Sequence, residues 1–306
     1  MSHLSFYWLP ENKHLLIQGL ETEFAQLVEM SIRNGKISMP PIPNVVIKIQ
    51  QLCSDNSSTV ADVAACLTDD PGLAAAVIRI ANSVIFNRRN ITCYDLNTAV
   101  ARLGIVRTRD IVTAQAIEQL KLALQVSQSS QDILTQSARA SREFAASMVL
   151  VTQSFKQLYP LDYQYLESEK ALLTGLLADI GLFCLVNEYH LYLENGHYLD
   201  ENIALQIFQS KCAITSQQVL SHWGFDNDFV EVASNQLIIN KTVPVSYLDI
   251  ARITNHLLLF RKQDDELDEH EVEINTSGAE VLYYLSNLST AEFDTRLKQV
   301  IHNTGF

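Results

Sequence analysis

The most constraining feature of this chain is an apolar run from Ala171 to Asn187, ALLTGLLADIGLFCLVN, in which Asp179 is the only ionisable carboxylate. The run is shorter than the roughly 20 residues that a membrane span needs, and two glycines interrupt it. We therefore predict a helix over Glu167–Glu188 that is buried inside a globular protein. The acid in this helix could be part of a metal site, the base of an enzyme, or a polar group that fixes helix packing.

Helical periodicity extends over most of the remaining chain, and no segment shows the alternation of a half-buried strand. Capping residues mark several helix starts: Thr59 and Asp62 have capping-box spacing, and Asp70 precedes a proline at the first helical position. Asn44 is expected to cap the helix that follows a proline-rich segment. The sequence thus predicts an all-α fold, with further helices over Glu11–Arg33, Ile133–Leu158, Ile203–Cys212, Thr215–Trp223, Asn227–Asn235, Tyr247–Phe260, Ser277–Leu288 and Thr290–Ile301.

Charge and cysteine usage restrict the class of protein. The net charge of −13 argues against general binding to nucleic-acid backbones or anionic membranes, which attract basic proteins. The five cysteines contain no CxxC pair, a pattern typical of reduced thiols. The first residues lack the charged-then-apolar pattern of a secretory signal. We therefore predict a cytoplasmic protein that does not enter a membrane and does not bind nucleic-acid backbones in general, while a local basic surface stays open.

Between Ile37 and Phe260 the chain carries a series of short motifs in a defined order. They are PPIP (Pro40–Pro43), DDPGL (Asp69–Leu73), RIANS (Arg79–Ser83), RLG (Arg102–Gly104) followed by Arg107, GLLADIGLF (Gly175–Phe183) and HWGFDNDFVEVA (His222–Ala233). This series resembles the HDOD domain, an output or signalling module related to the HD phosphohydrolases. The resemblance implies an all-helical, two-lobed domain, related to the HD-domain helical fold, of regulatory and non-enzymatic character.

The resemblance also suggests how the chain is divided. We expect a helical extension over residues 1–36, an N-terminal lobe over 37–128, an HD-like lobe with a degenerate motif over 129–262, and an acidic loop with C-terminal helices over 263–306. The polar segment Gln125–Asp132 is predicted to be the linker between the lobes. The acidic run Asp264–Glu273 is predicted to be a solvated loop.

Active HD phosphohydrolases hold metal ions with histidines and aspartates, among them an adjacent His-Asp pair. At the histidine position of that pair this chain has Ala178, while Asp179 remains. The other positions of this vestigial pocket align with residues that are neither histidine nor aspartate, namely Ser137, Cys212, Asn235, Gln236 and Asn255. One carboxylate with hydroxyl, thiol and amide groups does not form the shell of a catalytic divalent metal. We therefore predict no catalytic residues, no metal and no cofactor.

Without a metal, Asp179 needs another partner, because an unpaired buried carboxylate costs several kcal/mol or shifts its pKa upward. We predict hydrogen bonds to Asp179 from hydroxyl, amide or backbone N–H groups of neighbouring helices. Ser137 is the first candidate.

A cluster of arginines stands out in this acidic protein. Between Arg79 and Arg109 there are six arginines, with Asp95 as the only acid. Arg79 and Arg102 are predicted to pair internally with nearby aspartates. A basic docking surface for an acidic partner protein, or for a nucleotide or nucleic acid, is predicted for the others, with the exposed turn NRRN at its centre. Its residues are Arg88, Arg89, Arg107 and Arg109.

Together these patterns favour a non-catalytic signal-transduction module that acts through protein–protein interaction with an unidentified signalling protein. One alternative is a small-ligand sensor that binds a nucleotide in the vestigial pocket. The other is a residual metal-dependent phosphohydrolase.

Overall fold

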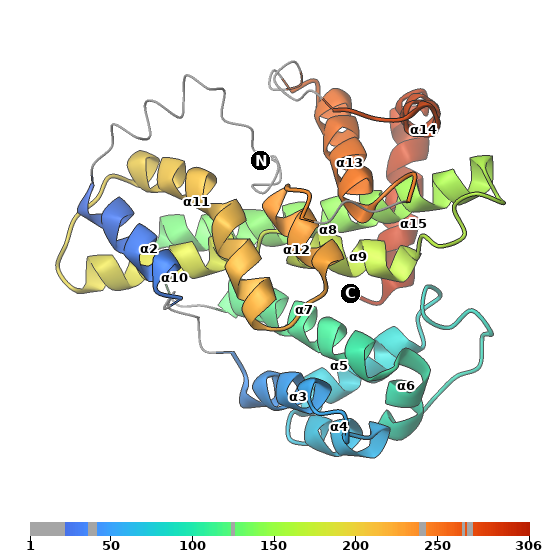
Figure 1. The fold of residues 1–306 in the computed structure, drawn as a ribbon, viewed down its shortest axis with the longest axis horizontal. Helices are drawn as coiled ribbons and strands as arrows, with labels where there is room; N and C mark the ends of the chain where they lie inside the picture. Colours follow the sequence, from blue (N-terminus) through green and yellow to red (C-terminus); the bar gives the residue numbers. More distant parts are fainter. Residues whose placement is uncertain (1–21, 36–41, 124–125, 239–242, 265–266, 268–271) are drawn as a thin grey trace.

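The computed structural model describes residues 22–35, 42–123, 126–238, 243–264, 267 and 272–306. Over these residues the secondary structure is α-helical apart from a single short 3-10 position, and no strand is present, which confirms the predicted all-α fold (Figure 1). The predicted helical residues 11–21 and the prolines at 40 and 41 lie outside the described residues.

Four short helices form the N-terminal lobe, at the bottom of Figure 1: α3 (Asn44–Ser54), α4 (Val60–Leu67), α5 (Pro71–Ala81) and α6 (Leu96–Leu103). The capping box of Thr59 and Asp62 is confirmed, and so is the Asp70 cap, which accepts hydrogen bonds from the N–H groups of Gly72 and Leu73. The Asn44 prediction is wrong. Pro43 holds the N-cap position of α3 and Asn44 is already helical, so its side chain cannot reach the first turn.

Helix α7 (Ile105–Ala123) joins this lobe to the rest of the molecule. It packs against α3, α5 and α6 on one side and against α8 (Gln128–Leu158) and α9 (Ser168–Leu177) on the other. Twelve of its residues are buried, among them several polar ones, as expected for a helix covered on both sides. The predicted linker Gln125–Asp132 is wrong in part, because Ser127 caps α8 and the helix begins at Gln128.

The second lobe is built around α8, α9 and α10 (Ile180–Glu194). Helix α11 (Glu201–His222) packs on α10, and α12 (Asn227–Ser234) and α13 (Tyr247–Lys262) close the other side. Two predicted helices, Ile203–Cys212 and Thr215–Trp223, form the single helix α11, because no residue between them breaks the backbone hydrogen bonding.

The apolar run of the sequence forms two helices rather than one. Helix α9 ends at Leu177 and α10 starts at Ile180, so that Ala178 and Asp179 lie in the break between them. The combined stretch Ser168–Glu194 is the one part of the described chain long and apolar enough to cross a membrane, and 94% of its most apolar window is buried inside the protein. This agrees with the predicted buried location.

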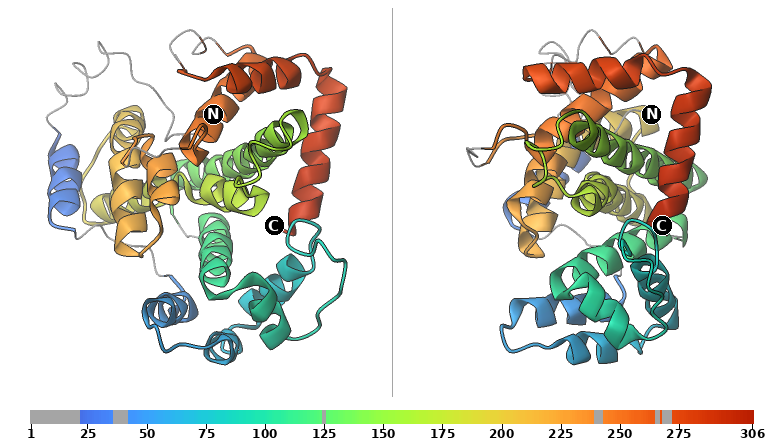
Figure 2. Two further views of the ribbon diagram at one scale, coloured as in Figure 1. Left: turned by 45° about the vertical axis from the view of Figure 1, so that its right-hand side comes forward. Right: turned by 90° about the vertical axis from the view of Figure 1, so that its right-hand side faces the viewer.

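The remaining helices lie on the outside. Helix α2 (Glu23–Arg33) covers α10 and α11, with the ring of Phe24 5.2 Å from that of Tyr192. Helices α14 (Thr276–Ser286) and α15 (Thr290–Thr304) pack on α8, and α15 runs back toward the N-terminal lobe (Figure 2). At its end the carbonyl of Asn303 accepts a hydrogen bond from the N–H of Ile85 at 3.5 Å.

Candidate functional site: a buried charge cluster and an arginine-lined cleft

Asp179 is buried at the junction of three helical segments and is paired with a lysine. The ammonium of Lys121, on α7, lies 2.9 Å from Asp179 Oδ1, and both side chains are at most 4% exposed. The same ammonium donates a hydrogen bond to Ser137 Oγ, on α8, also at 2.9 Å. Ser137 Oγ in turn donates to Asp179 Oδ2. The three side chains therefore form a closed ring of hydrogen bonds, which we call the buried charge cluster.

The hydrogen bond from Ser137 confirms the first partner that the sequence predicted for Asp179. The lysine was not foreseen. Its sequence signal is weak, because a lysine near the end of an amphipathic helix usually lies at the surface. The one available clue is that a buried carboxylate needs a cation. This clue does not identify Lys121, because the two residues of the ion pair are 58 positions apart in the sequence.

Tight helix packing surrounds the buried charge cluster. A Cβ atom on Gly181 would lie 2.4 Å from the carbonyl oxygen of Cys212, and one on Gly175 would lie 2.6 Å from the Cα of Ala145. The N–H of Gly181 donates to Ser216 Oγ at 2.8 Å. The two glycines of the GLLADIGLF motif thus allow α10 to approach α11 and α9 to approach α8 on either side of Asp179.

Cys212 lies near the cluster without acting as a ligand. Burial, and then the negative charge of Asp179, raises the pKa of the Cys212 thiol to about 12. Its sulfur is 3.9 Å from Ser216 Oγ. A thiol in this state stays protonated at neutral pH, so it is not a nucleophile.

The residues of the cluster do not fit a metal ion. A divalent cation at Asp179 would lie beside the Lys121 ammonium in a buried site, where like charges repel strongly. The other groups there are a hydroxyl that already bonds to both charges and a protonated thiol. In the part of the chain that the structure describes, no three His, Cys, Asp or Glu side chains form a group that could hold a metal.

The other predicted members of the vestigial pocket lie in different surroundings. Ala178 is fully buried in the break beside Asp179. Asn235 ends α12 in the left-handed conformation, and its side-chain oxygen accepts a hydrogen bond from Arg252 at 2.9 Å. Gln236 is exposed. Asn255 is buried on α13, and its membership of the pocket stays a prediction.

Arg88, Arg89 and Arg107 from the predicted basic surface lie together at the boundary of the two lobes. With Arg102 and the carboxylates of Glu167 and Glu169, they line a cleft of about 490 Å³, which we call the arginine cleft. Arg88 pairs with Glu169 at 2.7 Å and Arg107 with Glu167 at 2.7 Å. Two carboxylates from the start of α9 therefore neutralise part of the basic surface.

Arg109 does not belong to this surface, and that part of the prediction is wrong. Its guanidinium is buried, donates to Asp110 Oδ1 at 2.7 Å and to the Gly224 carbonyl at 2.9 Å, and lies over the ring of Phe225. It faces inward because α7 turns this position toward Gly224 and Phe225, in the turn between α11 and α12. Burial is the main cause that raises the pKa of the neighbouring Asp110 to about 6.

Arg79 and Arg102 are engaged internally, as predicted, but with different partners. Arg79 donates to the side-chain oxygen of Gln115, and Arg102 donates to the carbonyls of Ala81 and Ile91. Arg102 thereby fixes the loop between α5 and α6. Most of the acidic run Asp264–Glu273, predicted to be a solvated loop, lies outside the described residues.

Comparison with known proteins places the chain among helical relatives. No curated protein sequence matches it. A protein of Shewanella amazonensis SB2B, provisionally named a metal-dependent phosphohydrolase, has a similar structure with a TM-score of 0.67 and 20% identity, over 97% of this chain and 99% of that one. An HDOD domain protein of unknown function from Geobacter sulfurreducens matches with a TM-score of 0.48 and 16% identity, over 92% of this chain and 97% of that one. The likeness to the Shewanella protein, at 20% identity, concerns the fold alone.

The sequence itself gives the family. The model of the HDOD domain matches residues 39–238, about two thirds of the chain, and this region contains α3 to α12 with both the buried charge cluster and the arginine cleft. The protein belongs to the HDOD domain family.

Proposed function

We propose that the protein is a non-catalytic regulatory module that acts by binding another signalling protein. The observation that carries the proposal is the Lys121 ammonium bound to Asp179 and Ser137. By resemblance, Asp179 aligns with an aspartate that holds metal in the active HD phosphohydrolases. Here the Lys121 side chain of the protein itself pairs with that carboxylate, so that Asp179 serves helix packing.

The same geometry weighs against the two alternatives from the sequence. A nucleotide in the vestigial pocket would have to displace Lys121, because the side chain of Lys121 is buried and bonded to Asp179 and Ser137. Metal-assisted hydrolysis needs a metal-bound water, for which these residues offer no adequate ligands.

The arginine cleft is the surface that we assign to the partner. Arg89 is exposed and pairs with none of the described residues, so its guanidinium is available to a carboxylate or phosphate of another protein. A basic surface on a protein with a net charge of −13 favours an acidic partner segment in one orientation, because the rest of the molecule repels it.

The surface is tested with Arg89→Glu. We expect a partner that wild-type protein captures from a lysate of the source cell to be lost with this variant, and its affinity, measured with purified partner, to fall as salt rises. Lys298→Glu makes the same charge change at an exposed position outside the cleft and should leave capture unchanged. Unchanged capture by Arg89→Glu would overturn this assignment of the surface.

The absence of catalysis is tested separately by elemental analysis and a phosphodiesterase assay with bis(p-nitrophenyl) phosphate and added Mn²⁺. We expect no stoichiometric metal and no hydrolysis above the level of the free ion. Hydrolysis that disappears in Asp179→Asn would refute the non-catalytic assignment.

A further inference from the structure

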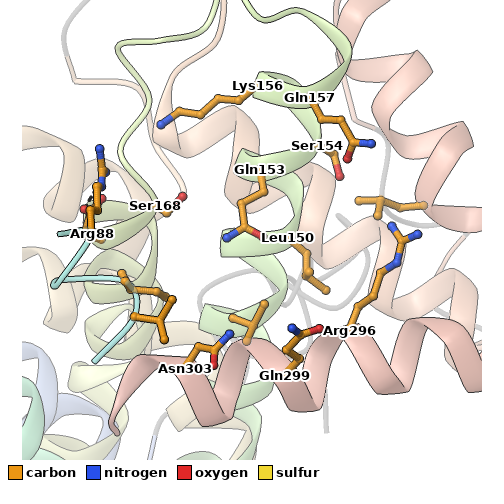
Figure 3. Close-up of a pocket in the computed structure, with 15 residues that line it drawn as sticks. Arg88, Leu150, Gln153, Ser154, Lys156, Gln157, Ser168, Arg296, Gln299 and Asn303 are labelled. Atoms are coloured by element: carbon orange, nitrogen blue, oxygen red, sulfur yellow. Dashed lines mark hydrogen bonds and ion pairs between the residues drawn. The ribbon is translucent and has the colours of Figure 1, made fainter. Parts of the chain in front are cut away.

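A second cleft, which shares Arg88 and Glu169 with the arginine cleft, lies between the lobes under the C-terminal helix. Its volume is about 500 Å³, within the usual range for small-molecule sites. Its walls come from α8, from α15, from the segment after α5 and from the start of α9. Figure 3 shows side chains of α8 and α15 that project toward the same space, among them Gln153, Lys156, Gln299 and Asn303.

The charged groups of this cleft are mainly positive. Arg88, Lys156 and Arg296 line it, against the single carboxylate of Glu169. Arg296 is held in place by hydrogen bonds to the hydroxyl of Tyr284 at 2.8 Å and to Glu292 at 2.7 Å. A fixed guanidinium loses little conformational entropy when it binds an anion.

Lys156 is the cation of the cleft that lacks an ion-pair partner, although the carboxylates of Glu169 and Glu167 lie near enough to act on its charge. Its ammonium makes no ion pair or hydrogen bond with the described residues, whereas Arg88 and Arg296 each have a carboxylate partner. Burial, followed by the positive charge of Arg88, lowers the pKa of Lys156. An anion bound between Lys156 and Arg88 would relieve both effects.

The uncharged groups of the cleft suit a ligand with several polar atoms and one apolar face. Amides of Gln153, Gln299 and Asn303 and the hydroxyl of Ser168 can donate and accept hydrogen bonds, while Leu150 and Val300 provide an apolar wall. Ser168 opens α9, whose N-cap residue makes no side-chain cap bond, so that backbone N–H groups remain at this end.

Glu169 favours a ligand that carries a hydrogen-bond donor. Its side chain is 7% exposed, its Oε1 binds Arg88 at 2.7 Å, and its Oε2 is buried without a hydrogen-bonding partner among the described residues. An unsatisfied buried acceptor is costly. A ligand with a hydroxyl or amino group next to its anionic group could satisfy this oxygen after a small side-chain movement.

We propose that this inter-lobe cleft binds a small phosphorylated metabolite that also carries hydroxyl or amino donors, of the class of mononucleotides and sugar phosphates. The phosphate lies between Lys156 and Arg88, and the polar body of the ligand faces Glu169 and the amides of α8 and α15. The inference goes beyond the proposed protein partner and can be tested on the purified chain alone.

Binding is measured by titration calorimetry with AMP, ribose 5-phosphate, inorganic phosphate and adenosine. We expect AMP or ribose 5-phosphate to bind more tightly than inorganic phosphate, and adenosine to bind at least tenfold more weakly than AMP. The stronger of the two organic phosphates identifies the subclass. Lys156→Gln should weaken binding about tenfold, as expected for the loss of one charge-assisted hydrogen bond.

Lys298→Gln serves as the matched control, because it removes the same charge from an exposed position of α15 outside the cleft. It should bind like the wild type, and both variants should melt within a few degrees of it. The proposal is overturned if neither organic phosphate binds at millimolar concentration, if adenosine binds as well as AMP, or if folded Lys156→Gln binds as tightly as Lys298→Gln.

Discussion

Two cation–carboxylate pairs of this molecule have similar geometry and very different surroundings. Lys121 and Asp179 lie 2.9 Å apart, and Arg88 and Glu169 lie 2.7 Å apart. Both carboxylates are nearly buried, with side-chain exposures of 4% and 7%. The cations differ, because Lys121 is 2% exposed and Arg88 is 68% exposed.

The two pairs differ in the solvent access of the cation rather than in the contact itself. We infer that a buried cation forms a purely structural pair, whereas an exposed cation can leave its carboxylate for another anion. The ammonium of Lys121 can bind nothing new unless the helices separate. The guanidinium of Arg88 borders both clefts and can turn to a ligand or partner without unfolding. This distinction can be tested on variants of the two pairs and of their surroundings.

The largest effect is expected from Lys121→Met, which leaves Asp179 buried with no cation. The free energy of unfolding should fall by about 3–5 kcal/mol in urea titrations. Adding Asp179→Asn should recover a large part of this loss, because the uncompensated charge is removed. A double variant as unstable as the single one would show that the ion pair does not stabilise this core.

The walls of the buried charge cluster are tested by Gly181→Ala. The added Cβ would lie 2.4 Å from a backbone oxygen of α11, so the two helices must move apart, at a cost of about 1–3 kcal/mol. Gly72→Ala, in the first turn of α5, meets only a side-chain oxygen at 3.3 Å and should change stability little. Equal stabilities of the two variants in thermal melts would contradict this account of the packing.

A third ion pair, Arg109–Asp110, should make the free energy of unfolding depend on pH. The pKa of Asp110 is raised from 3.8 to about 6, chiefly by burial, so the folded state binds a proton more tightly than the unfolded state. Its contribution to stability is therefore full below pH 3.8 and is lost as pH rises through 6. Between pH 7 and pH 5 the wild type should gain about 1–2 kcal/mol relative to Asp110→Asn. Parallel stability curves would exclude this linkage.

The smallest effect is expected for Arg88→Gln, about 1 kcal/mol or less at low salt. Because Arg88 faces solvent, 0.5 M NaCl should shrink that difference, whereas it should leave the effect of Lys121→Met unchanged. Denaturant titrations of both variants at two salt concentrations make the comparison. An equal response to salt would remove the distinction between the two pairs.

The helical fold and two of the three members of the buried charge cluster could be predicted from short spacings and from motif order. The Thr59–Asp62 capping box and the Asp70 cap need only neighbours three residues away, and both were predicted from sequence. Ser137 was predicted because the resemblance aligns it opposite Asp179. These features depend on short spacing or on motif order, which a sequence displays directly.

The burial of Lys121 and Arg109 could not be predicted, because it depends on which faces of α7 are covered by other helices. Lys121 and Arg109 both have the sequence context of surface residues, and both are buried because α7 is packed on two sides. The partners of Arg109 are its neighbour Asp110 and the carbonyl of Gly224, which is 115 positions away. No periodicity in the helix itself distinguishes a buried cation from an exposed one until the opposing helices are known.

The position of Lys121 also has a consequence for how such chains can be recombined. Lys121 belongs to the predicted 37–128 lobe and Asp179 to the predicted 129–262 lobe, so each lobe contains a charge whose neutralising partner lies in the other. A chimera that joins the second lobe of this chain to the first lobe of a relative without a lysine at this position would inherit an unbalanced acid. The two lobes should therefore be exchanged between relatives only as a pair. We expect both lobes to melt in one calorimetric transition.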